Sequence, residues 1–175
     1  KNYANSKKIN FCNLRYFNVA GADEDLQIGE NHQPETHLIP LLIEAIIKKK
    51  KFNLYGNNYD TKDGTCVRDF IHVEDLANAH ILALKTIFKK KINGAINVGS
   101  GSGYSVKDII NETEKQLKLK AKIKIQKRRN GDIKKLISCI KLAKKKINWK
   151  PKKKIKDIIN SSIKYYLKLN NIKYF

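Results

Sequence analysis

Short apolar stretches alternate with longer amphipathic ones along this chain of 175 residues. Candidate strands are rich in aliphatic and aromatic side chains, as buried strands are. They cover residues 11–19, 52–55, 67–73 and 95–98. Residues 122–125 alternate between apolar and polar side chains, which is typical of a half-buried strand.

Four stretches with apolar residues at helical spacing predict helices. The first has Pro40 in its first turn and ends in consecutive lysines, which the helix dipole favours at a C-terminus. Asp75 is the predicted N-cap of the second, and Ser105 with Asp108 forms a predicted capping box for the third. The last covers residues 155–167. Strands that alternate with helices predict an α/β chain with some parallel sheet.

A run of Gly-Ser-Gly-Ser-Gly at residues 99–103 lies between a predicted strand and a predicted helix. This position suits a phosphate-binding loop, because glycine lets backbone N–H groups approach an anion. The run nevertheless lacks the Lys-Ser or Lys-Thr of a Walker loop and the Gly-x-Gly-x-x-Gly spacing of a dinucleotide turn. A plain turn is favoured over a phosphate cradle, and both interpretations stay open at this point.

Arginine stands next to aspartate in Arg68-Asp69, and residues 128–132 read Arg-Arg-Asn-Gly-Asp. A guanidinium can bind two phosphate oxygens at once, and a nearby carboxylate can accept from ribose hydroxyls. Surface ion pairs, which contribute little to stability, explain these residue types equally well.

The histidines do not have the spacing of a metal motif such as His-Glu-x-x-His. They are His32, His37, His72 and His80. No metal site is therefore expected, and no self-contained acid/base or nucleophilic centre is predicted.

The formal net charge of +21 is concentrated in the last third of the chain. Residues 1–114 hold 15 basic and 14 acidic side chains, whereas residues 115–175 hold 22 and 2. Nucleic acid is one explanation, and drift in an AT-rich genome, which favours Lys, Ile and Asn, is another. A nucleic-acid surface would carry exposed aromatic residues, but Trp149 is expected to pack beside Ile147. Nucleic acid is thus not the expected partner.

The three cysteines have neither zinc nor disulfide spacing, which favours ordinary thiols in a reducing compartment. No run approaches the ~20 apolar residues of a membrane span. The polar first residues do not resemble a signal peptide. These features together predict a cytoplasmic protein.

Six segments follow one another in a distinctive order. They are residues 14–22 (Leu-Arg-Tyr-Phe-Asn-Val-Ala-Gly-Ala), 36–40 (Thr-His-Leu-Ile-Pro), 55–77, 97–101, 128–132 and 147–149. Together they closely resemble the UDP-glucose 4-epimerases of the extended short-chain dehydrogenase/reductase group. The long insertion between Gly56 and Arg68 favours this family over dehydratases, decarboxylases and glucuronate epimerases of the same group, which usually have a short turn there.

The resemblance implies the C-terminal part of such an enzyme, with the last strands and helices of a Rossmann-type sheet and a smaller substrate-binding α/β domain. Residues 1–22 would end the Rossmann-type domain. Residues 23–175 would form mainly the substrate-binding domain, with residues 67–119 contributing elements back to the sheet. The resemblance also implies NAD as cofactor, UDP-glucose and UDP-galactose as substrates interconverted through a 4-keto intermediate, and a homodimer.

The resemblance also assigns roles to individual residues. Asn18, Arg68 and Arg129 would hold the diphosphate, and Asp132 would bond the uridine ribose. The residues that match segments lining uracil and phosphates are His37, Leu38, Asn53, Leu54 and Tyr55, with the Tyr55 ring stacked on the base.

Two further positions follow from the same comparison. Phe17 matches a residue that touches the nicotinamide part of the cofactor. Leu136 matches the position where side-chain size bears on the admission of N-acetylated hexosamines. Leucine is intermediate in bulk, so acceptance of those sugars stays open.

The family's glycine-rich NAD turn and its Tyr-x-x-x-Lys catalytic pair belong upstream of the strand at residues 11–19. Tyr3 and Lys7 have the pair's spacing, but Tyr3 precedes Asn18 by only fifteen residues, too few for the helix that normally intervenes. No catalytic residue is assigned, and the chain alone is expected to be inactive. The alternatives are another UDP-sugar enzyme of the group, such as a glucuronate epimerase or decarboxylase, and a decayed fragment acting only as a basic binding module.

Overall fold

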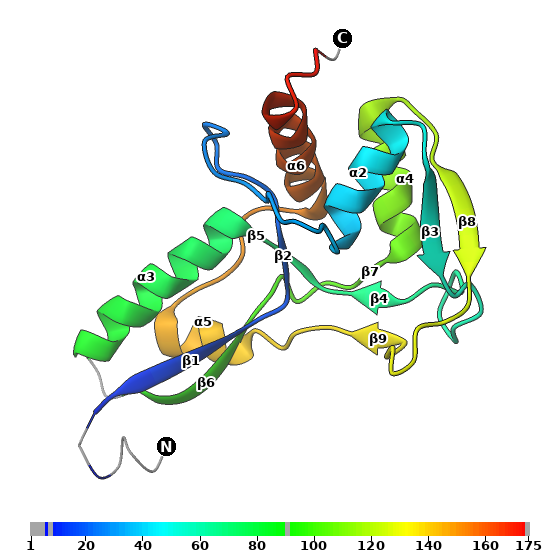
Figure 1. Ribbon diagram of the computed structural model, residues 1–175. Coiled ribbons are helices and arrows are strands. Elements are labelled where there is room, and N and C mark those ends of the chain that lie inside the picture. Colours follow the sequence, from blue (N-terminus) through cyan, green and yellow to red (C-terminus); the bar gives the residue numbers. More distant parts are fainter. Residues whose placement is uncertain (1–5, 7–8, 90–91, 174–175) are drawn as a thin grey trace.

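A computed structural model describes residues 6, 9–89 and 92–173 (Figure 1). Its strands are β1 (Phe11–Tyr16), β2 (Asn18–Ala20), β3 (Lys51–Tyr55), β4 (Val67–Arg68), β5 (Phe70–His72), β6 (Asn93–Val98), β7 (Tyr104–Ser105), β8 (Lys122–Gln126) and β9 (Lys135–Leu136). Its helices are α2 (Leu38–Ile47), α3 (Val73–Lys89), α4 (Val106–Leu117), α5 (Lys141–Ile147) and α6 (Ile155–Leu169). The predicted α/β class is confirmed.

Parallel pairing dominates the sheets of the described residues. Parallel pairs join β1 to β6, β2 to β5, and β3 to β8, while β4 lies between antiparallel β7 and parallel β9. The single strand predicted over residues 11–19 is two strands, because the chain changes partner at Phe17. Its N–H donates to Val98 O of β6, whereas the N–H of Asn18 donates to Asp69 O beside β5.

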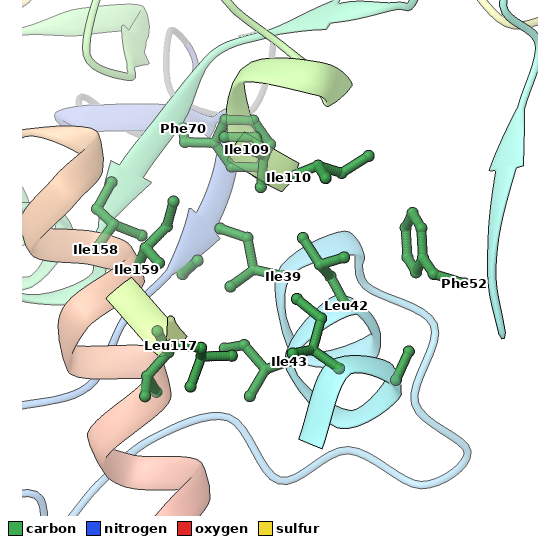
Figure 2. Packing of buried hydrophobic residues seen from close by; sticks show 14 residues of the cluster. Ile39, Leu42, Ile43, Phe52, Phe70, Ile109, Ile110, Leu117, Ile158 and Ile159 are labelled. Carbon is green, nitrogen blue, oxygen red and sulfur yellow. The ribbon is translucent and has the colours of Figure 1, made fainter. Parts of the chain in front are cut away.

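A first apolar core lies among α2, α4 and α6. Figure 2 shows side chains of α2 turned toward residues of the other two helices. The buried members labelled there are Ile39, Leu42, Ile43, Phe52, Phe70, Ile109, Ile110, Leu117, Ile158 and Ile159. Each such side chain contributes roughly 1.5–3 kcal/mol when fully buried, so this cluster holds the three helices together.

A second core lies between the β1–β6 pair and helices α3 and α5, on the opposite side of the molecule from β3 and β8 (Figure 1). Trp149 and Ile147 are both buried in it, so the predicted packing of Trp149 is confirmed. The indole Nε1–H donates to Asp75 O at 3.0 Å, which satisfies the polar end of the ring. Helix α5 was not predicted from the sequence.

Helix starts follow local hydrogen bonding, with one correction. The capping box is confirmed, because Ser105 Oγ accepts from Asp108 N and Asp108 Oδ2 accepts from Ser105 N, both at 2.9 Å. The predicted N-cap at Asp75 is wrong, since α3 already begins at Val73. Asp75 Oδ2 instead accepts from the backbone N–H groups of Lys152 and Lys153, and so anchors the segment before α6.

The expected half-buried character of residues 122–125 is also wrong. They form β8, but Ile123 is 39% exposed and Ile125 57%. The reason is that β8 is the edge strand of a two-stranded sheet and has β3 as its neighbour on one side.

Among the described residues, no helix has the length and apolar character that crossing a membrane would require. The division into domains stays a prediction. Helix α4, which belongs to the segment 67–119 that was expected to contribute to the Rossmann-type sheet, packs with α2 and α6 in the first core. Tyr3 and Lys7 lie outside the described residues.

Candidate functional site

A large cavity of about 1230 Å³ opens between the two cores. It brings together every residue to which the sequence assigned a binding role. These are Phe17, Asn18, His37, Leu38, Asn53, Leu54, Tyr55, Arg68, Arg129, Asp132 and Leu136. They come from the junction of β1 and β2, from β2, β3, β4 and β9, from the start of α2, and from the loops before α2 and β9, so tertiary structure alone makes them neighbours.

Arg68 in β4 is held in place by residues just before β9. Its Nη1 donates to Val67 O at 3.0 Å and to Ile133 O at 2.6 Å, and its Nη2 lies 3.2 Å from Asp132 Oδ1. The ion pair is only partly exposed, with 19% of the Arg68 side chain and 30% of the Asp132 side chain accessible. These bonds use three of the five guanidinium N–H groups and fix the head group at the cavity wall.

Arg129 and its neighbour Arg128 reach different partners. The guanidinium of Arg129 lies over the Tyr55 ring, 4.0 Å from its centroid, in a cation–π contact on β3. Arg128 does not line the cavity. Its Nε donates to Asn58 Oδ1 at 2.7 Å, and its guanidinium lies 4.2 Å from the Tyr59 ring centroid. In this arrangement Arg129 covers one face of the Tyr55 ring.

The side chains of β3 alternate between an exposed and a buried face of the strand. Asn53 and Tyr55 are exposed on one face, and Asn53 Oδ1 accepts from Gln126 Nε2 at 3.0 Å across the β3–β8 pair. Leu54 is buried at 5% exposure on the other face. Leu54 therefore offers apolar shape and no polar side-chain group.

The N-terminus of α2 faces the same cavity. His37 is its N-cap residue, but its side chain makes no capping hydrogen bond, and the first turn holds no acidic residue. Leu38 is the first helical residue. A helix N-terminus of this kind attracts anions, because its first N–H groups have no partner within the helix and the dipole is positive there.

The change of strand partner places Phe17 and Asn18 at the cavity wall. Asn18 Nδ2 donates to Asp69 O at 2.7 Å, so the amide is fixed beside β5. Leu136 on β9 is opposite Arg68 in the β4–β9 register and is 44% exposed. Leu136 therefore borders the space next to the arginine head group.

Asp69 organises this region, and sequence reasoning missed its role. Its carboxylate is fully buried and accepts from backbone N–H groups of Ser100 at 2.7 Å and of Gly101 and Ser138 at 3.0 Å. The hydroxyl groups of both serines donate to it as well. Asp69 thus ties the 99–101 turn and the segment after β9 to the strand that carries Arg68.

The same bonds decide between the two interpretations of the glycine-rich run. The N–H groups of Ser100 and Gly101 point at the Asp69 carboxylate, and that of Ser102 donates to Ser100 Oγ at 3.1 Å. An internal anion therefore occupies the place that a phosphate would need. The run is a plain turn.

The insertion at residues 57–65 is an ordered loop rather than a free one. Asp63 Oδ1 accepts from Thr65 N at 2.9 Å and Thr65 Oγ1 at 2.7 Å, and Ser105 Oγ donates to Asp63 Oδ2. Burial raises the pKa of Asp63, but these hydrogen bonds outweigh it and hold that pKa below its ordinary value. The loop is thereby fastened to the start of α4.

Similarity to known proteins agrees with this geometry. The sequence model of the family described as "NAD dependent epimerase/dehydratase family" matches residues 1–99. The chain belongs to that family. A relative within it, a UDP-glucose 4-epimerase from Rhizobium meliloti, is 40% identical over 171 residues, covering 97% of this chain and 52% of the relative. Another, from Lactobacillus helveticus, is 44% identical over 160 residues, covering 90% and 48%.

Solved structures of the family match over the same extent. A UDP-glucose 4-epimerase from Stenotrophomonas maltophila, with bound NAD and formylated UDP-arabinopyranose, has a TM-score of 0.91 and 31% identity, covering 96% of this chain and 51% of that one. The Bifidobacterium longum enzyme, in complex with NAD⁺ and UDP, has a TM-score of 0.89 and 34% identity, covering 97% and 51%. The chain thus spans about half the length of the relatives it matches.

Proposed function

We propose that this chain forms the UDP-sugar-binding part of a UDP-glucose 4-epimerase, an isomerase that interconverts UDP-glucose and UDP-galactose. The observation that carries the proposal is the convergence of Arg68, Arg129, Asp132 and Asn18 on one cavity, although they are far apart in sequence. Relatives with this name and fold, one of them solved with NAD⁺ and UDP, support it.

The two arginines would bind the diphosphate. Arg68 has two N–H groups beyond those used by Val67, Ile133 and Asp132, and the Arg129 guanidinium lies over the Tyr55 ring. The N-terminus of α2, at Leu38, adds favourable dipole charge. Partly desolvated contacts at roughly 1.5–3 kcal/mol each would supply much of the ~8 kcal/mol of a micromolar affinity.

Asp132 would accept from the ribose while it holds Arg68, and the Tyr55 ring would meet the uracil on the face that Arg129 leaves open. The proposed contacts end at the diphosphate, so the hexose beyond it could turn between two orientations. Such a turn is what a 4-epimerase needs, because hydride leaves C4 from one face and returns to the other.

NAD supplies that hydride chemistry when bound, and this chain offers Phe17 for the nicotinamide. Phe17 fits such a contact because it lines the cavity at the change of strand partner. We assign no catalytic residue to this chain. The Rossmann-type division at residue 22, the cytoplasmic location, the role in galactose metabolism and a homodimer belong to the same proposal.

Isothermal titration of the chain with UDP tests the site. Arg68→Ala and Arg129→Ala should each weaken the affinity at least tenfold. Arg128→Ala is a matched control, since it removes the same charge from a neighbouring side chain that points to Asn58. Its affinity should stay within about twofold. If UDP does not bind, or binds equally well to all three variants, the proposal fails.

Sugar preference separates the 4-epimerase from a glucuronate-modifying relative. The cavity has Leu136 beside Arg68, and the long 57–65 insertion favours the 4-epimerase. UDP-galactose should therefore compete with a fluorescent UDP analogue more strongly than UDP-glucuronate does. Stronger competition by UDP-glucuronate would favour the other enzyme class.

A further inference from the structure

Two histidines and two glutamates meet in the loop before α2, at residues 30–37. His37 Nδ1 contacts Glu30 Oε1 and lies 3.4 Å from Glu35 Oε1. The rings of His32 and His37 are stacked, with centroids 5.6 Å apart and 29° between their planes. Candidate ligand atoms of His32, Glu35 and His37 all lie within 4.8 Å of one another.

These distances suit a small metal ion after a minor adjustment. Ligands about 2.1 Å from a tetrahedral metal are roughly 3.4 Å from each other. The His37–Glu35 separation of 3.4 Å already has this value. Glu35 is also held in place, because the same Oε1 accepts from Thr36 N at 2.6 Å and His37 N at 2.7 Å.

The charges around the cluster also favour a cation. The carboxylates of Glu30 and Glu35 both approach Nδ1 of His37. Two carboxylates placed this close to each other repel. A divalent ion would relieve this repulsion and use the preferred ligands of borderline metals, imidazole nitrogen and carboxylate oxygen.

We propose that His32, Glu35 and His37, with Glu30 in contact with His37, form a binding site for a divalent transition metal of the zinc type. The bound ion would join the 30–37 loop to the N-cap of α2 at the edge of the cavity, which Glu30 and His37 line. Spacing in sequence conceals the site, because its ligands lie on an irregular loop and not at i and i+4 of a helix. The inference does not rest on the proposed enzymatic function.

A simpler arrangement accounts for the same contacts without metal. A protonated His37 would form an ion pair with both glutamates, and His32 would be a bystander. The two cases differ in what they require. A metal uses His32 directly as a ligand, whereas the contacts between His37 and the two glutamates are indifferent to His32.

Titration of the chain with Zn²⁺ by calorimetry, and with Co²⁺ by visible absorption, distinguishes them. We expect one ion per chain, with d–d bands of tetrahedral Co²⁺, and at least tenfold weaker binding in His32→Ala and in Glu35→Gln. His80→Gln is the matched control, because it removes a histidine on α3 that bonds Tyr16 and Leu76. It should bind both metals as the unmodified chain does.

Three results would overturn the inference: no saturable binding of either metal, binding that all variants share, or binding that His80→Gln weakens most. Titration of His32→Ala with UDP keeps the two proposals separate. His32 does not line the cavity, so its removal should leave UDP affinity within about twofold whatever happens to Zn²⁺. Circular dichroism of each variant confirms that the fold is retained.

Discussion

Arg68 Nη2 lies 3.2 Å from Asp132 Oδ1 although 64 residues separate the two in sequence. The sequence places arginine and aspartate together in each of two motifs, Arg68-Asp69 and residues 128–132. The structure joins the arginine of one motif to the aspartate of the other, and Asp69 is buried. The ion pair therefore connects β4 to the loop before β9.

This connection should be measurable as a coupling energy. In a double-mutant cycle with Arg68→Ala and Asp132→Ala, urea unfolding should give about 0.5–1 kcal/mol of coupling, because the pair is only partly shielded from solvent. Coupling should shrink at high salt. Additive losses from the two single variants would show that the pair contributes nothing.

Asp69→Ala should destabilise the chain by at least about 3 kcal/mol. It leaves the buried N–H groups of Ser100, Gly101 and Ser138 without their acceptor. Asp69→Asn should cost less, since one oxygen remains. Asp60→Asn is the control, because Asp60 is largely exposed and pairs only with Lys134 in the described structure. Unfolding midpoints of Asp69→Ala and Asp60→Asn that agree would contradict the role given to Asp69.

The stability of the chain should decline as pH falls below about 6.5. Burial lowers the pKa of His72, and its Nδ1 accepts from Glu74 N at 3.2 Å, so the folded state prefers the neutral ring. The unfolded chain then binds more protons in this range, and stability is fully present only above the unfolded pKa. Thermal unfolding from pH 7.5 to 5 should show the loss.

The variant His72→Gln tests this assignment. Its unfolding temperature should depend less on pH across the same range, while His80→Gln should keep the dependence of the unmodified chain. If the unfolding temperature depends equally on pH in the unmodified chain and in His72→Gln, the effect belongs to other groups.

Gly64→Ala should unfold the chain far more readily than Gly131→Ala. Both glycines have positive φ, at +79° and +82°, so both substitutions carry about 1 kcal/mol of backbone strain. A Cβ at Gly64 would lie 2.1 Å from Asn57 O, whereas nothing lies within 4 Å of one at Gly131. The backbone oxygen of Asn57 cannot move away from such a Cβ unless the 57–65 loop opens. Similar unfolding midpoints for the two variants would refute this account.

Local signals in the sequence were reliable guides to single elements. The capping box at Ser105 and Asp108 was predicted from side chains three residues apart, and the burial of Trp149 from its apolar neighbour. Such features depend on contacts within a few residues. The error at Asp75 has the opposite origin, because its partners Lys152 and Lys153 are more than seventy residues away.

The binding residues could be named by resemblance, but their proximity could not be calculated from the chain. Nothing near Arg68 in sequence indicates that Asp132 is its partner or that Arg129 lies over Tyr55. Likewise, the spacing of His32, Glu35 and His37 excluded known metal motifs, yet an irregular loop brings them together.

By itself, the sequence determined the α/β class, most helices and strands, and membership of a family, because periodicity, caps and short motifs act over neighbouring residues. Tertiary structure alone decided that the chain changes strand partner at Phe17 and that the Asp69 carboxylate accepts hydrogen bonds from the glycine-rich turn. It also decided that two arginines border one cavity. These outcomes depend on hydrogen bonds and charges between distant segments, whose pairing is chosen only when the cores form.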